Sequence, residues 1–201
     1  MNTTTDTWYQ AAEAPEQTEF GPVTGLSVTG SGEPGGTAYV AALTALYAVA
    51  GQVLGLAAEH GRPMPDAWCP LPPLEGRWWV EDDRPALEVP RADWHWHLFL
   101  RLPDTADPAW AHQARERALG AGAPRTVARV QLVTVPGGRC VQAMHRGAFA
   151  DEPRTLAAMD AFMTSAGLVR DGLHHEIYLT DPGHTPPEHA RTILRQPVRP
   201  A

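Results

Sequence analysis

Apolar residues recur along the chain with two different spacings, and each spacing predicts a different kind of element. Between residues 38 and 60 they fall at steps of three and four, which predicts an amphipathic helix with Thr37 as its N-cap. The same reasoning predicts helices over residues 108–119 and 153–166, the second capped by Asp151. The chain is therefore expected to place three helices among its strands.

Alternation of apolar and polar residues predicts the strands. The clearest case is residues 93–102, where Trp94 and Trp96 share one face and the intervening histidines share the other. The sequence Pro136-Gly137-Gly138 is typical of a hairpin turn between two strands. The expected strands are residues 23–29, 76–81, 93–102, 125–135, 139–145, 174–180 and 191–198.

These elements follow a repeated order. Apart from the helix over residues 108–119, they form two tandem strand–helix–hairpin units. Such units predict an α+β fold, with a curved antiparallel sheet, helices on one face and a ligand groove on the other. Residues 1–19 show little periodicity and are expected to be a flexible N-terminal arm, with residues 20–201 as a single domain. Five prolines between residues 63 and 73 exclude regular structure there.

Composition narrows the function further. Sixteen basic and 23 acidic residues give a net charge of −7, which disfavours nucleic acid and anionic membranes as partners. The apolar stretch over residues 38–58 is interrupted by Thr44 and Gln52, so we expect a buried helix and not a membrane span. The first twenty residues lack the pattern of a signal peptide. Cys69 and Cys140 form no CxxC pair, which favours a reduced cytoplasmic protein, with one disulfide as the alternative.

Four histidines are candidate metal ligands. His95 and His97 share a strand face and could bind zinc, but no cysteine or third ligand accompanies them. His174 and His175 point to opposite faces of their strand. The sequence also lacks a GxSxG motif, a phosphate-binding loop and a dinucleotide fingerprint. We therefore expect no metal and no cofactor.

A glutamate in a late strand is the strongest candidate for chemistry. Glu176 shares strand parity with His174 and Tyr178, whereas Ile177 and Leu179 face the other side, which we expect to be the helix side. Burying a carboxylate is costly, and burial would raise its pKa and let it act as an acid or base near neutral pH. The alternative is a structural glutamate that pairs with an arginine across the sheet.

Two further residues have both a functional and a structural interpretation. Glu152 lies in the first turn of a predicted helix, where it could project into a groove or simply interact with the helix dipole. If it joins Glu176, the two form a paired-carboxylate site. His145 ends a strand, where the alternative to ligand contact is hydrogen bonding to backbone.

Tryptophan is unusually frequent, with seven in 201 residues. Trp78, Trp79, Trp94 and Trp96 cluster in the two strands of the first predicted hairpin. Some of them are expected to pack in the core, and the others to stack against a flat aromatic ligand.

Four stretches carry a family resemblance: PPLEGRWW (72–79), DWHWHLFLRLPD (93–104), RCVQAMHRGAFADEP (139–153) and HHEIYLTDPGHTPPEHARTILRQPV (174–198). Together they resemble the GyrI-like small-molecule-binding family, in its branch of stand-alone proteins without a DNA-binding domain. The resemblance covers roughly residues 20–199. It is looser at Gly147-Ala148-Phe149, where the family usually has Gly-Pro-Tyr or a similar sequence.

The resemblance implies a groove between the two units into which Glu176 projects. It also implies an activity, because some stand-alone members hydrolyse the strained cyclopropane of DNA-alkylating spirocyclopropyl-dienone compounds of the yatakemycin and duocarmycin type, for self-resistance. We therefore expect a cofactor-free hydrolase, monomeric or homodimeric, with Glu176 and Glu152 as catalytic residues. The residues expected to contact the flat aromatic substrate are Trp79, Trp94, Trp96, His145, Phe149, His174 and Tyr178. The alternatives are a domain that only binds or sequesters aromatic or cationic compounds, and a protein antagonist of DNA gyrase.

Overall fold

The computed structural model describes residues 7–62, 71–104 and 106–201. The chain forms two compact units. Unit 1 consists of residues 1–22, 73–75 and 136–201, and unit 2 of residues 23–72 and 76–135. Residues 63–70, which include Cys69 and most of the proline-rich segment, lie outside the described residues.

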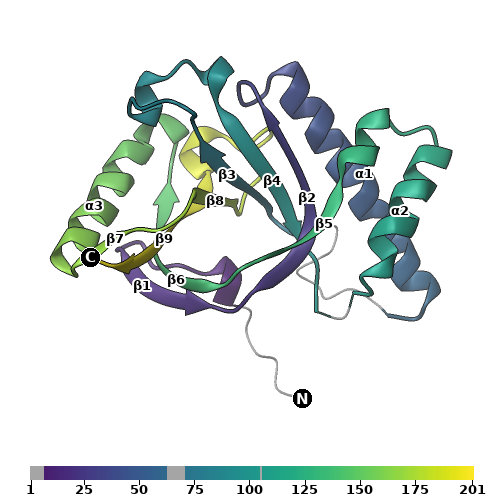
Figure 1. Ribbon diagram of the computed structural model, residues 1–201, viewed down its shortest axis with the longest axis horizontal. Coiled ribbons are helices and arrows are strands. Elements are labelled where there is room, and N and C mark those ends of the chain that lie inside the picture. Colours follow the sequence, from purple (N-terminus) through teal and green to yellow (C-terminus); the bar gives the residue numbers. More distant parts are fainter. Residues whose placement is uncertain (1–6, 63–70, 105) are drawn as a thin grey trace. The chain divides into compact units, whose positions relative to one another are not determined.

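Unit 2 contains the N-terminal strand–helix–hairpin pattern (Figure 1). Its strands lie in the order β3-β4-β2-β5, and β2 pairs antiparallel with both β4 and β5. The first two residues of β3 belong to unit 1. The elements are β2 (Val23–Ser31), α1 (Thr37–Glu59), β3 (Leu74–Trp79), β4 (His95–Arg101), α2 (Ala109–Gly120) and β5 (Gln131–Val135).

Helix α1 forms the core of unit 2 together with one face of the sheet. Leu46, Val49 and Val53 of α1 are fully buried, as are Leu98 and Leu100 of β4, and α1 contacts β2, β4 and α2. By length and composition α1 could cross a membrane. Its buried apolar stripe instead makes it a core helix of this unit, as its amphipathic spacing predicts.

Unit 1 repeats the pattern with a second helix (Figure 1). The strand order is β1-β6-β9-β8, and β7 pairs with β9. Its core contains Val141, Ala143 and Leu194 of the sheet packed with Met159 and Met163 of α3. The elements are β1 (Glu16–Phe20), β6 (Gly138–Arg146), α3 (Glu152–Ser165), β7 (Leu168–Arg170), β8 (His174–Tyr178) and β9 (Arg191–Pro200).

The two units share one topology. In unit 2 the strands of the motif lie in the order β2-β4-β3, and in unit 1 in the order β6-β9-β8. In both cases the last strand of the motif lies between the other two. Each motif is extended by one outer strand, β5 beside β2 and β1 beside β6. The predicted α+β class, with antiparallel strands and two strand–helix–hairpin units, is confirmed.

Two expectations about the middle of the chain are wrong. Residues 125–135 are not one strand, because a 3-10 turn (Arg125–Arg129) comes first and buries Val127 against α1. Residues 136–138 are not a hairpin turn, because β5 pairs with β2 whereas β6 pairs with β1 and β9. Glycine is required there for a different reason: a Cβ on Gly137 would lie 2.2 Å from the carbonyl oxygen of Phe20.

The chain also forms regular structure earlier than the sequence predicts. A 3-10 turn (Thr7–Tyr9) buries Trp8, and β1 pairs with β6 in the register Glu16↔Gln142. This pairing is long-range, so no local periodicity reveals it. Neither predicted cap is made by a side chain: Gly36 is the N-cap of α1, and Asp151 caps α3 without a side-chain hydrogen bond.

Candidate functional site

Glu176 lies on the face of the unit 1 sheet that α3 covers. It is the cross-strand partner of Leu194, which packs against Met159 and Met163 of α3. Cross-strand partners in an antiparallel pair project from the same face. Ile177, and Leu179 by parity, therefore lie on the opposite face. The expectation that these two residues face the helix is wrong, because strand parity separates the faces without saying which one the helix covers.

The Glu176 carboxylate is held by a neighbour on its own strand. The Tyr178 hydroxyl donates a hydrogen bond to Oε2 of Glu176 over 2.7 Å. Nε2 of His174 lies 3.7 Å from the other oxygen, Oε1. Only 12% of the Glu176 side chain is exposed. The three residues that parity placed together thus form one partly buried cluster.

Phe149 joins this cluster from the segment that precedes α3. Its ring meets the Tyr178 ring edge-on, with the centroids 6.0 Å apart. The side chain is partly exposed, so the cluster has an aromatic edge that faces solvent. The structure therefore brings Phe149, His174, Glu176 and Tyr178 together. Glu152 is the first residue of α3, the helix that covers this face.

His145 occupies a structural position. It is 4% exposed, and both of its ring nitrogens are engaged inside the protein. Nε2 donates to the carbonyl of Ala148 over 3.0 Å, so Nδ1 accepts from the Thr155 hydroxyl, also over 3.0 Å. These bonds tie β6 to the start of α3, which favours the structural interpretation of this residue.

The three predicted tryptophans lie in unit 2 and differ in burial. Trp96 is 1% exposed and packs edge-on against Tyr39, so it is a core residue. Trp94 is half-buried and donates its indole N–H to the carbonyl of Val89 over 3.1 Å. Trp79 stacks on His95 with ring centroids 5.3 Å apart. Trp79 and Trp94 are thus better placed than Trp96 to meet a ligand.

Tyr39 was missed by the sequence reasoning. It stacks on Trp78, with centroids 6.0 Å apart and an interplanar angle of 14°, and Trp78 meets Trp94 edge-on. This aromatic cluster of unit 2 combines Tyr39 of α1 with Trp78 of β3 and with Trp94, which directly precedes β4. The helical spacing of Tyr39 predicted only a core role, and its partial exposure was not visible in the pattern.

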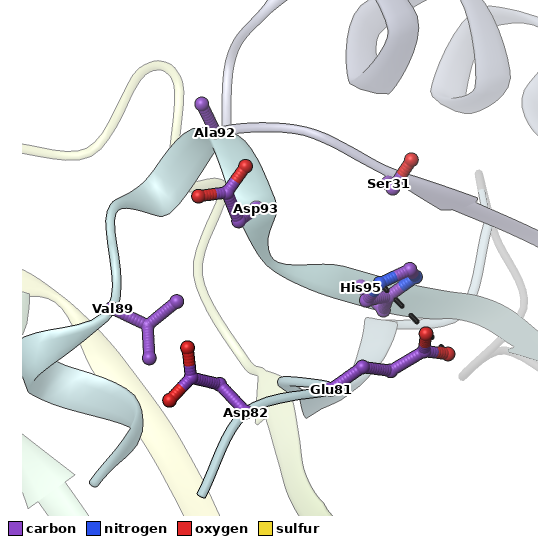
Figure 2. Close-up of a pocket in the computed structure, with 7 residues that line it drawn as sticks. All are labelled: Ser31, Glu81, Asp82, Val89, Ala92, Asp93 and His95. Carbon is purple, nitrogen blue, oxygen red and sulfur yellow. Dashed lines mark ion pairs between the residues drawn. The ribbon is translucent and has the colours of Figure 1, made fainter. Parts of the chain in front are cut away.

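A surface pocket of about 340 Å³ lies in unit 2 (Figure 2). It is strongly acidic, because Glu81, Asp82 and Asp93 line it together with His95, which is 4.0 Å from Glu81. A hydrogen bond from Arg84 lowers the pKa of Asp82 to about 2, so this carboxylate is ionised at neutral pH. The pocket contains none of the residues of the Glu176 cluster.

Two of the histidines considered as metal ligands, His95 and His97, have other partners. His95 stacks on Trp79, and Nε2 of His97 is 2.6 Å from the Ser27 hydroxyl. Within residues 7–62, 71–104 and 106–201, no group of three or more His, Cys, Asp or Glu side chains is arranged to hold a metal ion. Cys140 is a buried free thiol whose pKa burial raises to about 11.

Sequence reasoning also missed a buried polar network in unit 1. Glu75 is fully buried; it accepts a hydrogen bond from the indole N–H of Trp8 and pairs with Nε2 of His175, each over 2.8 Å. The guanidinium of Arg195 lies over the rings of both Trp8 and Phe20, 4.4 and 4.1 Å from their centroids. His175 is on the opposite face of β8 from Glu176. This network therefore holds β8 in place from the face that does not carry Glu176.

Two partly buried histidines predict that the protein loses stability in mild acid. Burial, with a smaller contribution from Arg170, lowers the pKa of His174 from 6.5 to about 4; burial and Arg77 do the same for His97. Between these values the unfolded chain binds protons that the folded chain does not, so stability is complete above pH 6.5 and falls as the pH decreases. His174 alone should cost about 2 kcal/mol between pH 6.5 and about pH 5. Urea unfolding at both pH values measures this loss, and a His174→Phe variant should show less of it; equal losses would contradict the assignment.

Comparisons with known proteins identify the family. Residues 120–199 match the GyrI-like small molecule binding domain. No curated protein matches the chain. An uncharacterized conserved protein from Listeria innocua is 34% identical, with a TM-score of 0.83 and 96% of each chain covered. A structure described as a hydrolase from the same organism is 35% identical, with a TM-score of 0.80 and coverage of 96% of this chain and 95% of that chain.

A more distant similarity concerns the fold alone. The C-terminal domain of EcmrR is 10% identical, with a TM-score of 0.55 over 93% of this chain and 98% of that chain. The specific similarity to the Listeria proteins extends over nearly the whole length, and the domain match covers the segment that contains Glu152 and Glu176. The chain belongs to the GyrI-like family of small-molecule-binding proteins.

Proposed function

We propose that this protein is a cofactor-free hydrolase that opens the cyclopropane of spirocyclopropyl-dienone compounds by adding water. The observation that carries the proposal is the Glu176 carboxylate, which is 12% exposed and oriented by the hydrogen bond from Tyr178. A partly desolvated carboxylate in a fixed orientation is a suitable general base. The 35% identical Listeria protein that is described as a hydrolase supports an enzymatic role.

The reaction needs few participants. Glu176 removes a proton from water, and the water oxygen forms a bond to the unsubstituted carbon of the cyclopropane. The carbon–carbon bond to the spiro centre breaks, and its electron pair moves through the dienone to give a phenolate, which then takes up a proton. The formation of an aromatic ring drives the reaction, so a correctly positioned general base is sufficient to catalyse it. The product no longer carries the alkylating group, which would give self-resistance.

Partly exposed aromatic residues in each of the two units support the proposed substrate class. Phe149 and Tyr178 flank the carboxylate in unit 1, and Trp79 and Trp94 are partly exposed in unit 2. Planar aromatic compounds pack well against such rings. Incubation with a duocarmycin-type compound, followed by mass spectrometry, tests the proposal. Addition of one water over many turnovers supports it, and recovery of unchanged compound contradicts it.

A second candidate is a domain that binds such compounds without turnover. The Tyr39, Trp78 and Trp94 cluster favours it, because stacked aromatic rings serve binding whether or not chemistry follows. In the same experiment, stoichiometric retention of intact compound would identify a binder.

Glu152 is the second carboxylate proposed for the reaction, and Glu152→Gln tests its role. Glutamine retains the shape and hydrogen-bonding capacity of this helix-start residue but removes its charge. We expect a loss of turnover of at least about tenfold with little change in stability, since the interaction with the helix dipole contributes about 0.3–1 kcal/mol. Turnover per folded molecule and melting temperature are measured together. A lower melting temperature with unchanged turnover would make Glu152 a helix-start residue only.

A further inference from the structure

We propose that His174 holds the attacking water together with Glu176 and is a further catalytic residue. This inference rests on the function proposed above and assigns the partner of the general base. His174 begins β8, two residues before Glu176, and projects from the same face of the strand.

The geometry leaves one nitrogen of His174 directed at the carboxylate without bonding to it. Nε2 is buried and has no hydrogen-bond partner among the residues that the structure describes. It lies 3.7 Å from Oε1 of Glu176, which is too long for a direct hydrogen bond. A single water can contact both atoms across this gap. A buried ring nitrogen is costly to leave unbonded, so a water at this position would also satisfy it.

The side chains around Glu176 determine which of its two carboxylate oxygens faces His174. Tyr178 donates to Oε2 of Glu176, whereas the distance to His174 is measured from Oε1. The carboxylate therefore has one oxygen held by tyrosine and the other near histidine. The two other buried histidines of unit 1 are unsuitable, because His145 uses both nitrogens structurally and His175 pairs with Glu75 on the opposite face.

The chemistry suits a neutral imidazole. Burial lowers the pKa of His174 to about 4, so the ring is uncharged at neutral pH and one of its nitrogens can accept a hydrogen bond from water. The water donates one hydrogen bond to Oε1 and the other to Nε2, whose proton is then on Nδ1. Both lone pairs of the water oxygen remain available for attack on carbon. The water proton passes to Glu176 as the carbon–oxygen bond forms, and His174 gains no charge in this step.

Two substitutions separate hydrogen bonding from space filling. His174→Phe fills the site but cannot bond to water, whereas His174→Gln places an amide group close to the position of Nε2. We expect kcat to fall about tenfold or more in His174→Phe and to recover most of this loss in His174→Gln, with KM changed less than about twofold in both. His184→Phe is the matched control, because that side chain is 88% exposed; it should behave like the unaltered protein.

The measurements are steady-state kinetics with a duocarmycin-type compound and compound binding by tryptophan fluorescence. Unchanged kcat in folded His174→Phe, with turnover in the unaltered protein, would overturn this inference alone. Equal losses in both His174 variants would also overturn it, because they would indicate a packing role. Absence of turnover in the unaltered protein would overturn the proposed function and this inference with it.

Discussion

Glu176→Gln is expected to reduce turnover by about two orders of magnitude or more while leaving the fold intact. The amide keeps the size of the side chain and an oxygen that accepts the hydrogen bond from Tyr178, but it cannot remove a proton from water. The free energy of unfolding should change by less than about 2 kcal/mol, because the side chain is only 12% exposed and removing its charge also removes a desolvation cost. Turnover and urea unfolding are to be measured on the same preparation.

A matched control is available in Glu188, an exposed glutamate of unit 1. Glu188→Gln removes one negative charge from the protein and should affect neither turnover nor stability. Binding of intact compound should persist in Glu176→Gln if the compound is neutral, and weaken if it is cationic. A Glu176→Gln protein that unfolds more easily but retains its turnover would show that Glu176 is a structural partner and that the base lies elsewhere.

Glu75→Leu should destabilise the protein by about 2–6 kcal/mol, because each of two buried polar groups left unsatisfied costs about 1–3 kcal/mol. Glu75 is fully buried and binds the indole N–H of Trp8 and the His175 ring. Leucine would leave both of these polar groups facing an apolar side chain. Urea unfolding monitored by tryptophan fluorescence measures the loss.

Glu75→Gln is the informative comparison. Its amide oxygen can accept from Trp8 and its amide nitrogen can donate to His175, so it should cost much less than leucine. If both variants are as stable as the unaltered protein, the network contributes nothing to the fold. If glutamine costs as much as leucine, the charge of Glu75 and not its hydrogen bonds stabilises unit 1.

The sequence predicted best what depends on local periodicity. The expected helices over residues 38–60, 108–119 and 153–166 agree with α1, α2 and α3 to within one residue at each end. The repeated strand–helix–hairpin order followed from these elements, since each one has its own spacing of apolar residues. Strand parity placed His174, Glu176 and Tyr178 together, and the structure adds the hydrogen bond between the last two.

What depends on contacts between distant residues could not be predicted. The pairing of β1 with β6 joins Glu16 to a partner at Gln142, and the sequence of neither strand indicates this partner. Glu75 stands beside apolar and aromatic residues in the sequence, yet its partners are Trp8 and His175, 67 and 100 residues away. The helix-covered face of β8 was assigned incorrectly for the same reason, because the position of α3 is set by Leu194 and its neighbours.

The way unit 1 is divided along the chain has a consequence for biosynthesis. Residues 7–20 leave the ribosome before unit 2 does, but β6, with which β1 pairs, is made more than a hundred residues later. Domains generally fold as units, in the order in which their residues emerge. Unit 2, whose strands and helices all lie between residues 23 and 135, should therefore fold before residues 7–20 can pair with β6. Trp8 contacts His175 and Arg195, so it would reach its buried position only after β8 and β9 have been made, and its fluorescence should report a late step of folding.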